Sequence, residues 1–569
     1  MPPPSPSADV KAGEEAAWGV EAKSEHIKLA FSALKSQLEK RGNARADFGR
    51  AVKLVPSDDA EARRNQSYPL IMALYGMFLE RTGCAEEAVD AYERAIAIEP
   101  LHSLAHGNLP GLLESRDAER AEKMYKKHIE VFPTHISVRI QYAAFLKRRK
   151  NDLAGAEQCF RDGLAAKPNH PECLARFAVF LHGALGKYDE AESVYSKAVK
   201  ADPNNATCLS NFGLFCAEVR RDPLRARQMY ENALAADSTH ANALYNYGVL
   251  LDTTESHGDQ EKALEMYRRA TESAPAHAFA WHNLAVLLSS KTDENDVEKA
   301  KDAFRRALRI NPNDAKTAED FGTFLAFKWG EYEAGAQWLE KAASLDPENG
   351  GVWNKLGNLH KSPRGKVDYQ KAKICYEKAC DADPFHADAY GSLGTLYSDV
   401  DANIPAAEGA YRKAIELNPR HPENLINMAD FLADVLSEEL SAHDARKPAD
   451  VLREAHDMYE MALQVAPSSV YVHQNYGGFL IRAAQDNLDV GIPNISAKSL
   501  YLRAEELFAS ALSIAPNDPV CLTNMAVIMW RQRRDYDAAQ TMFEAALAAS
   551  PGHPTAAAHY SAFKRDVGR

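Results

Sequence analysis

The feature that most constrains the fold of this chain is a short motif that returns along nearly its whole length. In one copy, the small residue Ala191, the aromatic residue Tyr195 and the small residue Ala198 stand at positions i, i+4 and i+7, and Pro203 follows. On a helix, side chains at this spacing share one face. Proline ends such a helix, because it has no N–H to donate and moves the preceding residue out of the α region. The motif therefore predicts a helix with a narrow ridge that a neighbouring helix can approach closely.

The same spacing, small-x3-aromatic-x2-small-x4-Pro, defines fourteen units. They end at Pro56, Pro100, Pro133, Pro168, Pro203, Pro275, Pro312, Pro347, Pro384, Pro419, Pro467, Pro516 and Pro551, with Ser238 in place of proline in one unit. Another helix begins after each of these residues, and in one unit it carries Gly213, which is small enough to let two helices of a pair touch. One helix pair cannot bury its apolar face alone, so the repeats predict stacked pairs with a continuous core.

These units resemble the tetratricopeptide repeat (TPR) family. The family pattern of an aromatic residue, then Leu-Gly, then Ala-x3-aromatic, then Pro is matched in one unit by Trp281, Leu284, Ala285, Ala300, Phe304 and Pro312. The resemblance covers about residues 24 to 566. It implies an all-α fold, a right-handed TPR superhelix (α-solenoid) of about fourteen helix-turn-helix repeats with a concave inner groove and a C-terminal capping helix.

The repeats leave little of the sequence for anything else. We expect a disordered tail at residues 1–23, which are rich in proline and then acidic, a TPR array at residues 24–554, and a capping helix and tail at residues 555–569. Insertions are expected near residues 57–68, 437–448 and 485–498. No stretch remains for a separate catalytic domain.

Charge and hydropathy argue against several classes of function. The formal net charge is −13, whereas nucleic-acid binding depends on many Lys and Arg contacts to phosphate. The sequence has no apolar run long enough for a membrane helix and no secretory signal, so we expect no membrane insertion and a cytoplasmic location, with a nuclear or a ciliary location as alternatives. The eight cysteines show no C-x2-C spacing and are expected to be buried, reduced side chains.

The main functional signal is a column of asparagines on the first helices. Two residues after the position of Trp281 in the family pattern, seven units carry the same residue type: Asn108, Asn211, Asn246, Asn283, Asn427, Asn475 and Asn524. By the family geometry this position faces the concave groove. The arrangement resembles the asparagine ladder of the repeat region of O-linked N-acetylglucosamine transferase, and an amide side chain can pair with both the C=O and the N–H of an extended peptide.

Two other interpretations of the asparagine column stay open. The amides could instead bond to a neighbouring helix or a turn, which is a structural role. The column is also interrupted in its middle by Arg176, Asp320, Lys355 and Ser392. The interruption is compatible with two binding segments and equally with contact to a folded partner.

Histidines and a basic stretch also recur at particular places. Histidine follows the proline position by two residues in eight units, at His102, His135, His170, His240, His277, His386, His421 and His553. Other units carry Asn, Asp or Ser there, so we expect helix N-caps, with pH sensing or metal binding as the alternative. The stretch Lys147 to Lys150, KRRK, is either a nuclear localisation signal or a favourable set of cations at a helix C-terminus.

The sequence therefore predicts a non-catalytic protein–protein interaction scaffold that binds an extended peptide in its concave groove. The alternative is a fixed structural subunit of a large multiprotein assembly, of the ciliary, transport or cell-cycle type, that uses its rims and convex face. No Walker loop, H-E-x-x-H motif or nucleophile elbow occurs in the sequence. We therefore expect no enzyme activity, cofactor, metal site or nucleic-acid partner.

Overall fold

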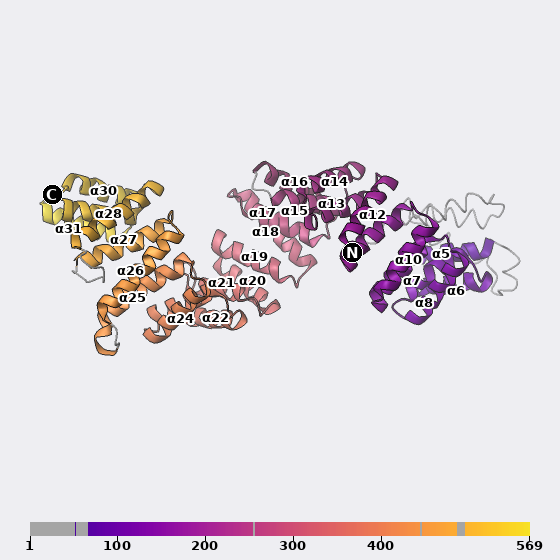
Figure 1. Cartoon of the computed structure of the whole chain (residues 1–569), viewed down its shortest axis with the longest axis horizontal. Coiled ribbons are helices and arrows are strands. Elements are labelled where there is room, and N and C mark those ends of the chain that lie inside the picture. The colour runs from indigo at the N-terminus through magenta and orange to yellow at the C-terminus, as the bar shows by residue number, and fades with distance from the viewer. Residues whose placement is uncertain (1–51, 53–66, 254–256, 444–446, 486–495, 569) are drawn as a thin grey trace. The chain divides into compact units, whose positions relative to one another are not determined.

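The computed structural model describes residue 52 and residues 67–253, 257–443, 447–485 and 496–568. Within these ranges the chain forms 27 consecutive α-helices and no strand (Figure 1). The predicted tail at residues 1–23, the unit that ends at Pro56, and nearly all of the insertion at 57–68 lie outside the described residues. The all-α class is confirmed for the part of the chain that the structure covers.

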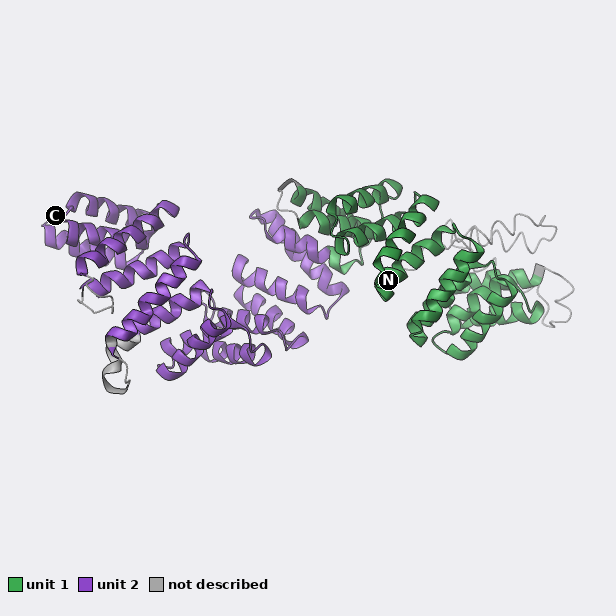
Figure 2. Cartoon of the chain, in the orientation of Figure 1, with its two compact units in different colours: residues 1–280 green, residues 281–569 purple. Residues whose placement is uncertain are grey.

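The chain divides into two compact units, Met1–Ala280 and Trp281–Arg569 (Figure 2). The helices of unit 1 are α5 (Ser67–Arg81), α6 (Ala85–Ile98), α7 (Ser103–Leu113), α8 (Ala118–Val131), α9 (Ile136–Phe145), α10 (Leu153–Ala166), α11 (Pro171–Phe180), α12 (Tyr188–Ala201), α13 (Ala206–Glu218), α14 (Pro223–Ala236), α15 (Ala241–Asp252) and α16 (His257–Ser273). Helix α17 (Ala278–Ser289) contains the boundary between the units.

Unit 2 continues the same alternation of helices. Its helices are α18 (Glu294–Ile310), α19 (Ala315–Thr323), α20 (Tyr332–Leu345), α21 (Gly350–Lys361), α22 (Tyr369–Ala382), α23 (Ala387–Asp399), α24 (Ile404–Leu417), α25 (Pro422–His443), α26 (Pro448–Val465), α27 (Val470–Gln485), α28 (Ala497–Ile514), α29 (Pro519–Ile528), α30 (Tyr536–Ala549) and α31 (Pro554–Val567). Four first helices end in a π-helical turn: η1 (Leu146–Lys150), η2 (Leu181–Leu185), η3 (Phe324–Trp329) and η4 (Met529–Arg533).

Helices α5 to α30 form thirteen pairs, each made of an odd-numbered first helix and an even-numbered second helix. Each second helix ends just before one of the predicted unit ends, from Pro100 to Pro551. The insertions after Pro419 and Pro467 begin within unusually long first helices, because α25 has 22 residues and α27 has 16. The final helix, α31, buries Phe563 against Trp530 and Phe543, and thus covers the last pair.

The predicted ridge of small and aromatic residues forms the core. Ala191, Tyr195 and Ala198 on α12 have at most 1% of their surface exposed. The corresponding aromatic rings of the other second helices are at most 5% exposed, for example Tyr230 at 1% and Tyr376 at 0%. The i, i+4, i+7 pattern is confirmed as the buried face of each second helix.

A small residue on the first helix receives the ring of the second helix. A Cβ atom at Gly213 of α13 would lie 2.7 Å from Cε1 of Tyr230 on α14, closer than real Cβ atoms approach a ring carbon. The same contact recurs in five other pairs: Gly76 with Tyr92, Gly248 with Tyr267, Gly357 with Tyr376, Gly394 with Tyr411, and Gly477 with Phe508. The sequence prediction that Gly213 lets the two helices lie together is confirmed.

The pair α19–α20 shows why the ring and the small residue depend on each other. Its second helix carries Leu339 in place of the ring, and the helices approach until backbone meets backbone. A Cβ atom at Gly335 would lie 2.8 Å from the carbonyl oxygen of Gly322. With a smaller side chain between them, the two helices close the gap through glycines on both sides.

This packing makes a test of the glycine–ring contact possible. We expect Gly213→Ala to destabilise the α13–α14 pair by up to about 2 kcal/mol, because overpacking of a core costs about 1–3 kcal/mol and the gain in helix propensity offsets only about 1 kcal/mol of this cost. Hydrogen exchange of the α13 and α14 amides measures this locally, since long repeat arrays need not unfold as one unit.

The matched control is Gly409→Ala on α24. A Cβ atom at Gly409 meets no atom within 4 Å, so the same substitution should stabilise its helix by about 0.5–1 kcal/mol. If Gly213→Ala increases the protection of the α13 amides over the wild type, as Gly409→Ala should do for α24, the packing argument is wrong.

Candidate functional site

The structure places all seven members of the predicted asparagine column on first helices. They occupy α7, α13, α15, α17, α25, α27 and α29, and each side chain is half-buried. Asn475 and Asn108 have identified partners within the chain: the Asn475 amide donates to the carbonyl of Tyr471 on its own helix at 3.1 Å, and Asn108 lies within hydrogen-bonding reach of the Tyr92 hydroxyl. At these two positions the asparagine side chain therefore has the alternative role, that of bonding to other residues of the chain itself.

The two charged residues that interrupt the column in unit 2, Asp320 and Lys355, each form an ion pair with another residue of the array. Lys355 on α21 pairs with Glu319 on α19 at 2.5 Å, and Lys316 pairs with Asp320 at 3.0 Å. Glu319 is only 6% exposed, so its charge needs a partner. The Lys355–Glu319 pair therefore links two neighbouring first helices, whereas the Lys316–Asp320 pair lies within α19. Both column charges have partners inside the chain.

Asn475 and Asn524 line one groove in unit 2. The groove, which we call the Gly478 groove, has a volume of about 450 Å³ and is formed by side chains of α25, α27, α29 and α31. Its lining residues are Asp430, Gln474, Asn475, Gly478, Ile481, Arg482, Gln485, Val520, Asn524, Val527 and His559. Three successive first helices and the final helix thus contribute to a single concavity.

The groove exists because one repeat has glycine, and therefore no side chain, at position 478 on its first helix. Gly478 directly follows the small residue Gly477 that packs on a ring, and a Cβ atom at Gly478 would meet nothing within 4 Å. At the same position other repeats carry larger residues, such as Leu214, Val249 and Val527. The Gly-Gly pair was the sequence signal for this groove, and our sequence analysis did not use it.

The charges in the Gly478 groove nearly balance. Arg482 forms an ion pair with Asp434, and Asp430 accepts a hydrogen bond from the Tyr459 hydroxyl. Burial raises the pKa of the Asp430 carboxyl to about 6 and lowers the pKa of the His559 imidazole. Ile481 and Val527 supply a buried apolar floor. This combination suits an uncharged backbone and an aliphatic side chain better than a strongly charged group.

Most of the recurring histidines are helix N-caps, as predicted. The Nδ1 atom accepts a hydrogen bond from the backbone N–H three residues later at 3.1–3.5 Å in His102, His170, His240, His277, His421 and His553. His386 makes no such bond, and His135 instead lies with its Nδ1 3.1 Å from Nε2 of His128. The described residues contain no group of three or more His, Cys, Asp or Glu side chains arranged to hold a metal ion.

Seven of the eight cysteines are buried as free thiols, and the eighth, Cys84, is half-buried. Burial raises the pKa of several of these thiols, for example to about 11 for Cys375 and to about 12 for Cys380. Such thiols are inert at neutral pH, which agrees with the predicted role as small core side chains. Among the helices that the structure describes, none has both the length and the apolar character to cross a membrane.

The repeated helix pairs define a helical-repeat scaffold of the kind that mediates protein interactions. Family models then specify the type of repeat. Models of the tetratricopeptide repeat match residues 217–278, 255–315 and 364–386, and the model of the middle TPR-like domain of cilia and flagella-associated protein 70 matches residues 112–207. Together with the thirteen pairs, these matches identify the array as one of tetratricopeptide repeats.

Solved structures of other repeat proteins are similar to this chain. Yeast Tom70 is 16% identical, with 88% of this chain and 96% of that chain covered and a TM-score of 0.37. The Cut9–Hcn1 hetero-tetramer of the APC/C contains a chain 13% identical, with 98% and 99% covered and a TM-score of 0.43. No curated protein matches the sequence of this chain.

The N-cap residue His102 makes the local stability of α7 dependent on pH. Burial and, secondarily, the neighbouring His106 lower the pKa of His102 to about 4. The unfolded chain binds this proton near pH 6.5, so His102 contributes stability above pH 6.5 that is lost as the pH falls toward 4. In the wild type, this titration should lower the local free energy of unfolding of α7 by about 2 kcal/mol on going from pH 7.5 to pH 5. We expect His102→Asn, which keeps a capping side chain, to abolish this loss.

Hydrogen exchange of the α7 amides at pH 7.5 and pH 5, corrected for intrinsic exchange rates, measures this difference between the wild type and the variant. Asparagine already caps other first helices, as Asn205 and Asn349 do, so the variant retains the bond without a titrating group. Equal pH dependence in the wild type and the variant would show that His102 does not titrate with unfolding.

Proposed function

We propose that this protein is a non-catalytic protein–protein interaction scaffold and that the Gly478 groove binds an extended peptide segment of a partner. The observation that carries the proposal is the position of two column asparagines, Asn475 and Asn524, along the same groove on consecutive first helices. Each amide offers an acceptor and donors to a peptide backbone. The open space above Gly478 lies beside them.

The apolar floor supports an anchor for one side chain of the peptide. Ile481 is 6% exposed and Val527 is 4% exposed, and both line the groove. A peptide side chain of the size of valine or leucine would cover this floor while the backbone pairs with the amides. The nearly balanced charges of Asp430, Asp434 and Arg482 give no strong preference for a charged residue at this point.

The magnitudes indicate that one groove binds weakly. Two amide hydrogen bonds contribute about 2 kcal/mol, and burial of one aliphatic side chain contributes about 2–3 kcal/mol. Micromolar affinity needs about 8 kcal/mol. The partner must therefore touch further parts of the array, since linked weak contacts raise the overall affinity without a new strong site.

A second candidate function is that of a fixed subunit in a larger assembly. Apolar side chains are exposed at corresponding turns of two consecutive repeats in unit 2, namely Phe327 and Trp329 in η3, and Val367 and Tyr369 before and at the start of α22. The match of residues 112–207 to a repeat domain of a cilia and flagella-associated protein supports a ciliary assembly as the setting.

The Gly478 groove can be closed without removing any side chain. We expect Gly478→Leu to fold normally, because its Cβ meets open space and leucine favours helix more than glycine does. The leucine side chain should occupy the groove and reduce peptide capture about tenfold or more. Affinity capture from native lysate, quantified by mass spectrometry, compares this variant with the wild type.

The matched control is Gly409→Leu, the same substitution at an exposed site on a second helix. Partners lost with Gly478→Leu alone would identify ligands of the groove, and Asn475→Ala with Asn524→Ala should weaken the same partners. If both leucine variants retain the full set, the groove proposal is wrong. Loss of partners on Trp329→Ser would then support the assembly function.

A further inference from the structure

A second repeat, in unit 1, also has glycine at the position that corresponds to Gly478. Gly111 on α7 occupies the position of Gly478 in the repeat register, one residue after Pro110, which stands where other repeats carry Gly or Ala. Every other described repeat carries a residue larger than glycine at this position. The nearest atom to a Cβ at Gly111 would be the Tyr125 hydroxyl, at 3.8 Å. A pocket of about 470 Å³ opens at this place, lined by Gly111, Glu114, Ser115, Arg148 and Arg149. We call it the Gly111 pocket.

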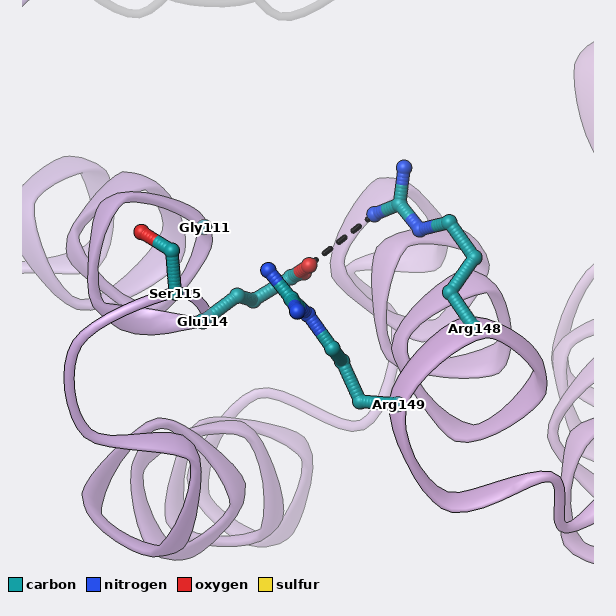
Figure 3. Close-up of a pocket in the computed structure, with 5 residues that line it drawn as sticks. All are labelled: Gly111, Glu114, Ser115, Arg148 and Arg149. Atoms are coloured by element: carbon teal, nitrogen blue, oxygen red, sulfur yellow. Dashed lines mark hydrogen bonds and ion pairs between the residues drawn. The ribbon is translucent and has the colours of Figure 1, made fainter.

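The chemistry of the Gly111 pocket differs from that of the Gly478 groove. All of its lining residues except glycine are polar or charged, and Figure 3 shows Glu114 and the two arginines pointing toward one another across the space between α7 and η1. Glu114 is nearly buried and is already satisfied, because it accepts hydrogen bonds from the Tyr125 hydroxyl at 2.9 Å and from Arg148 at 3.0 Å.

The four consecutive cations of η1 have different surroundings. Lys147 lies 6.0 Å from the centre of the Phe180 ring, Arg148 pairs with Glu114, and Lys150 pairs with Glu122 at 3.1 Å. Arg149 forms no ion pair with any carboxylate in the described part of the chain, and its side chain lines the pocket. One positive charge at the pocket mouth is therefore not neutralised by the protein itself.

We propose that the Gly111 pocket binds an anionic oxygen group on a side chain of a partner protein, either a phosphorylated serine or threonine or a carboxylate. The planar guanidinium of Arg149 can bond such a group through two N–H donors, and Arg148 and the exposed Ser115 hydroxyl stand beside it. The missing side chain at Gly111 provides the room. This site is separate from the Gly478 groove and does not depend on it.

Three immobilised decapeptide libraries test this site with the full chain. They share degenerate flanks and carry a central phosphoserine, glutamate or serine. We expect the wild type to bind the phosphoserine library at least fivefold better than the serine library at 0.15 M salt. Equal binding of the glutamate library identifies the ligand as a carboxylate, and weaker binding identifies it as a phosphate ester.

Matched variants decide whether the pocket itself is responsible. Arg149→Gln should reduce binding to the level of the serine library, whereas Lys147→Gln, which removes the same charge two residues away, should change it less than twofold. Gly111→Leu keeps every charge but fills the pocket, and it should also abolish the preference. Gly478→Leu should retain the preference, because the groove in the other unit plays no part in it.

Several results would overturn the proposal. Equal binding of the three libraries to the wild type would show that the pocket holds no anion. Equal losses in Arg149→Gln and Lys147→Gln would show a diffuse attraction by the basic stretch. Unchanged binding in Gly111→Leu would place the anion outside the pocket. Circular dichroism of each variant confirms that these exposed positions leave the helices intact.

Discussion

The structure depends on one contact that recurs along the chain, between a small residue on the first helix of a pair and a buried ring on the second. Gly213 and Tyr230 show the geometry, because a single added carbon would overlap the ring. A ring fills the space that glycine leaves, and the two helices approach as closely as their backbones allow. Where Leu339 replaces the ring, glycines on both helices restore the contact. Each pair then presents an apolar face that only the next pair can cover, and the array follows from that requirement.

Because this contact fixes the pairs, neighbouring positions on the first helix are free to vary. At the position after the small residue there is room for a side chain, because a Cβ atom at Gly478 would meet nothing within 4 Å and one at Gly111 only the Tyr125 hydroxyl at 3.8 Å, and most repeats carry a larger residue there. Where that residue is glycine, a concavity forms beside it, with an apolar floor at Gly478 and a charged rim at Gly111. The same change in two repeats thus produces two sites of different chemistry, since the residues one turn further along the helix differ. A scaffold with separate sites can hold one partner by several weak contacts.

Much of the fold could be predicted from the sequence because its determinants are local. The spacing of Ala191, Tyr195 and Ala198 predicts one face of a helix, and the position of His240, two residues after the unit end at Ser238, predicts a helix N-cap. The site was less predictable. Whether Asn475 faces a ligand or its own helix depends on a rotamer, and whether Lys355 is available depends on Glu319 of the preceding repeat. The groove at Gly478 is a concavity lined by residues of four helices, so no single stretch of the sequence predicts it.

We propose that partners bind in the concavity beside Gly478 rather than on the second helices of the pairs. Site-specific photo-crosslinking in cells tests it most directly, with a benzophenone amino acid placed at Gln485, at the end of the groove, and in parallel at Gly409 on a second helix. Binding in the groove should give crosslinks to a partner from Gln485 and none from Gly409. Crosslinks from Gly409 with none from Gln485 would show that partners bind on the second helices and not in the groove.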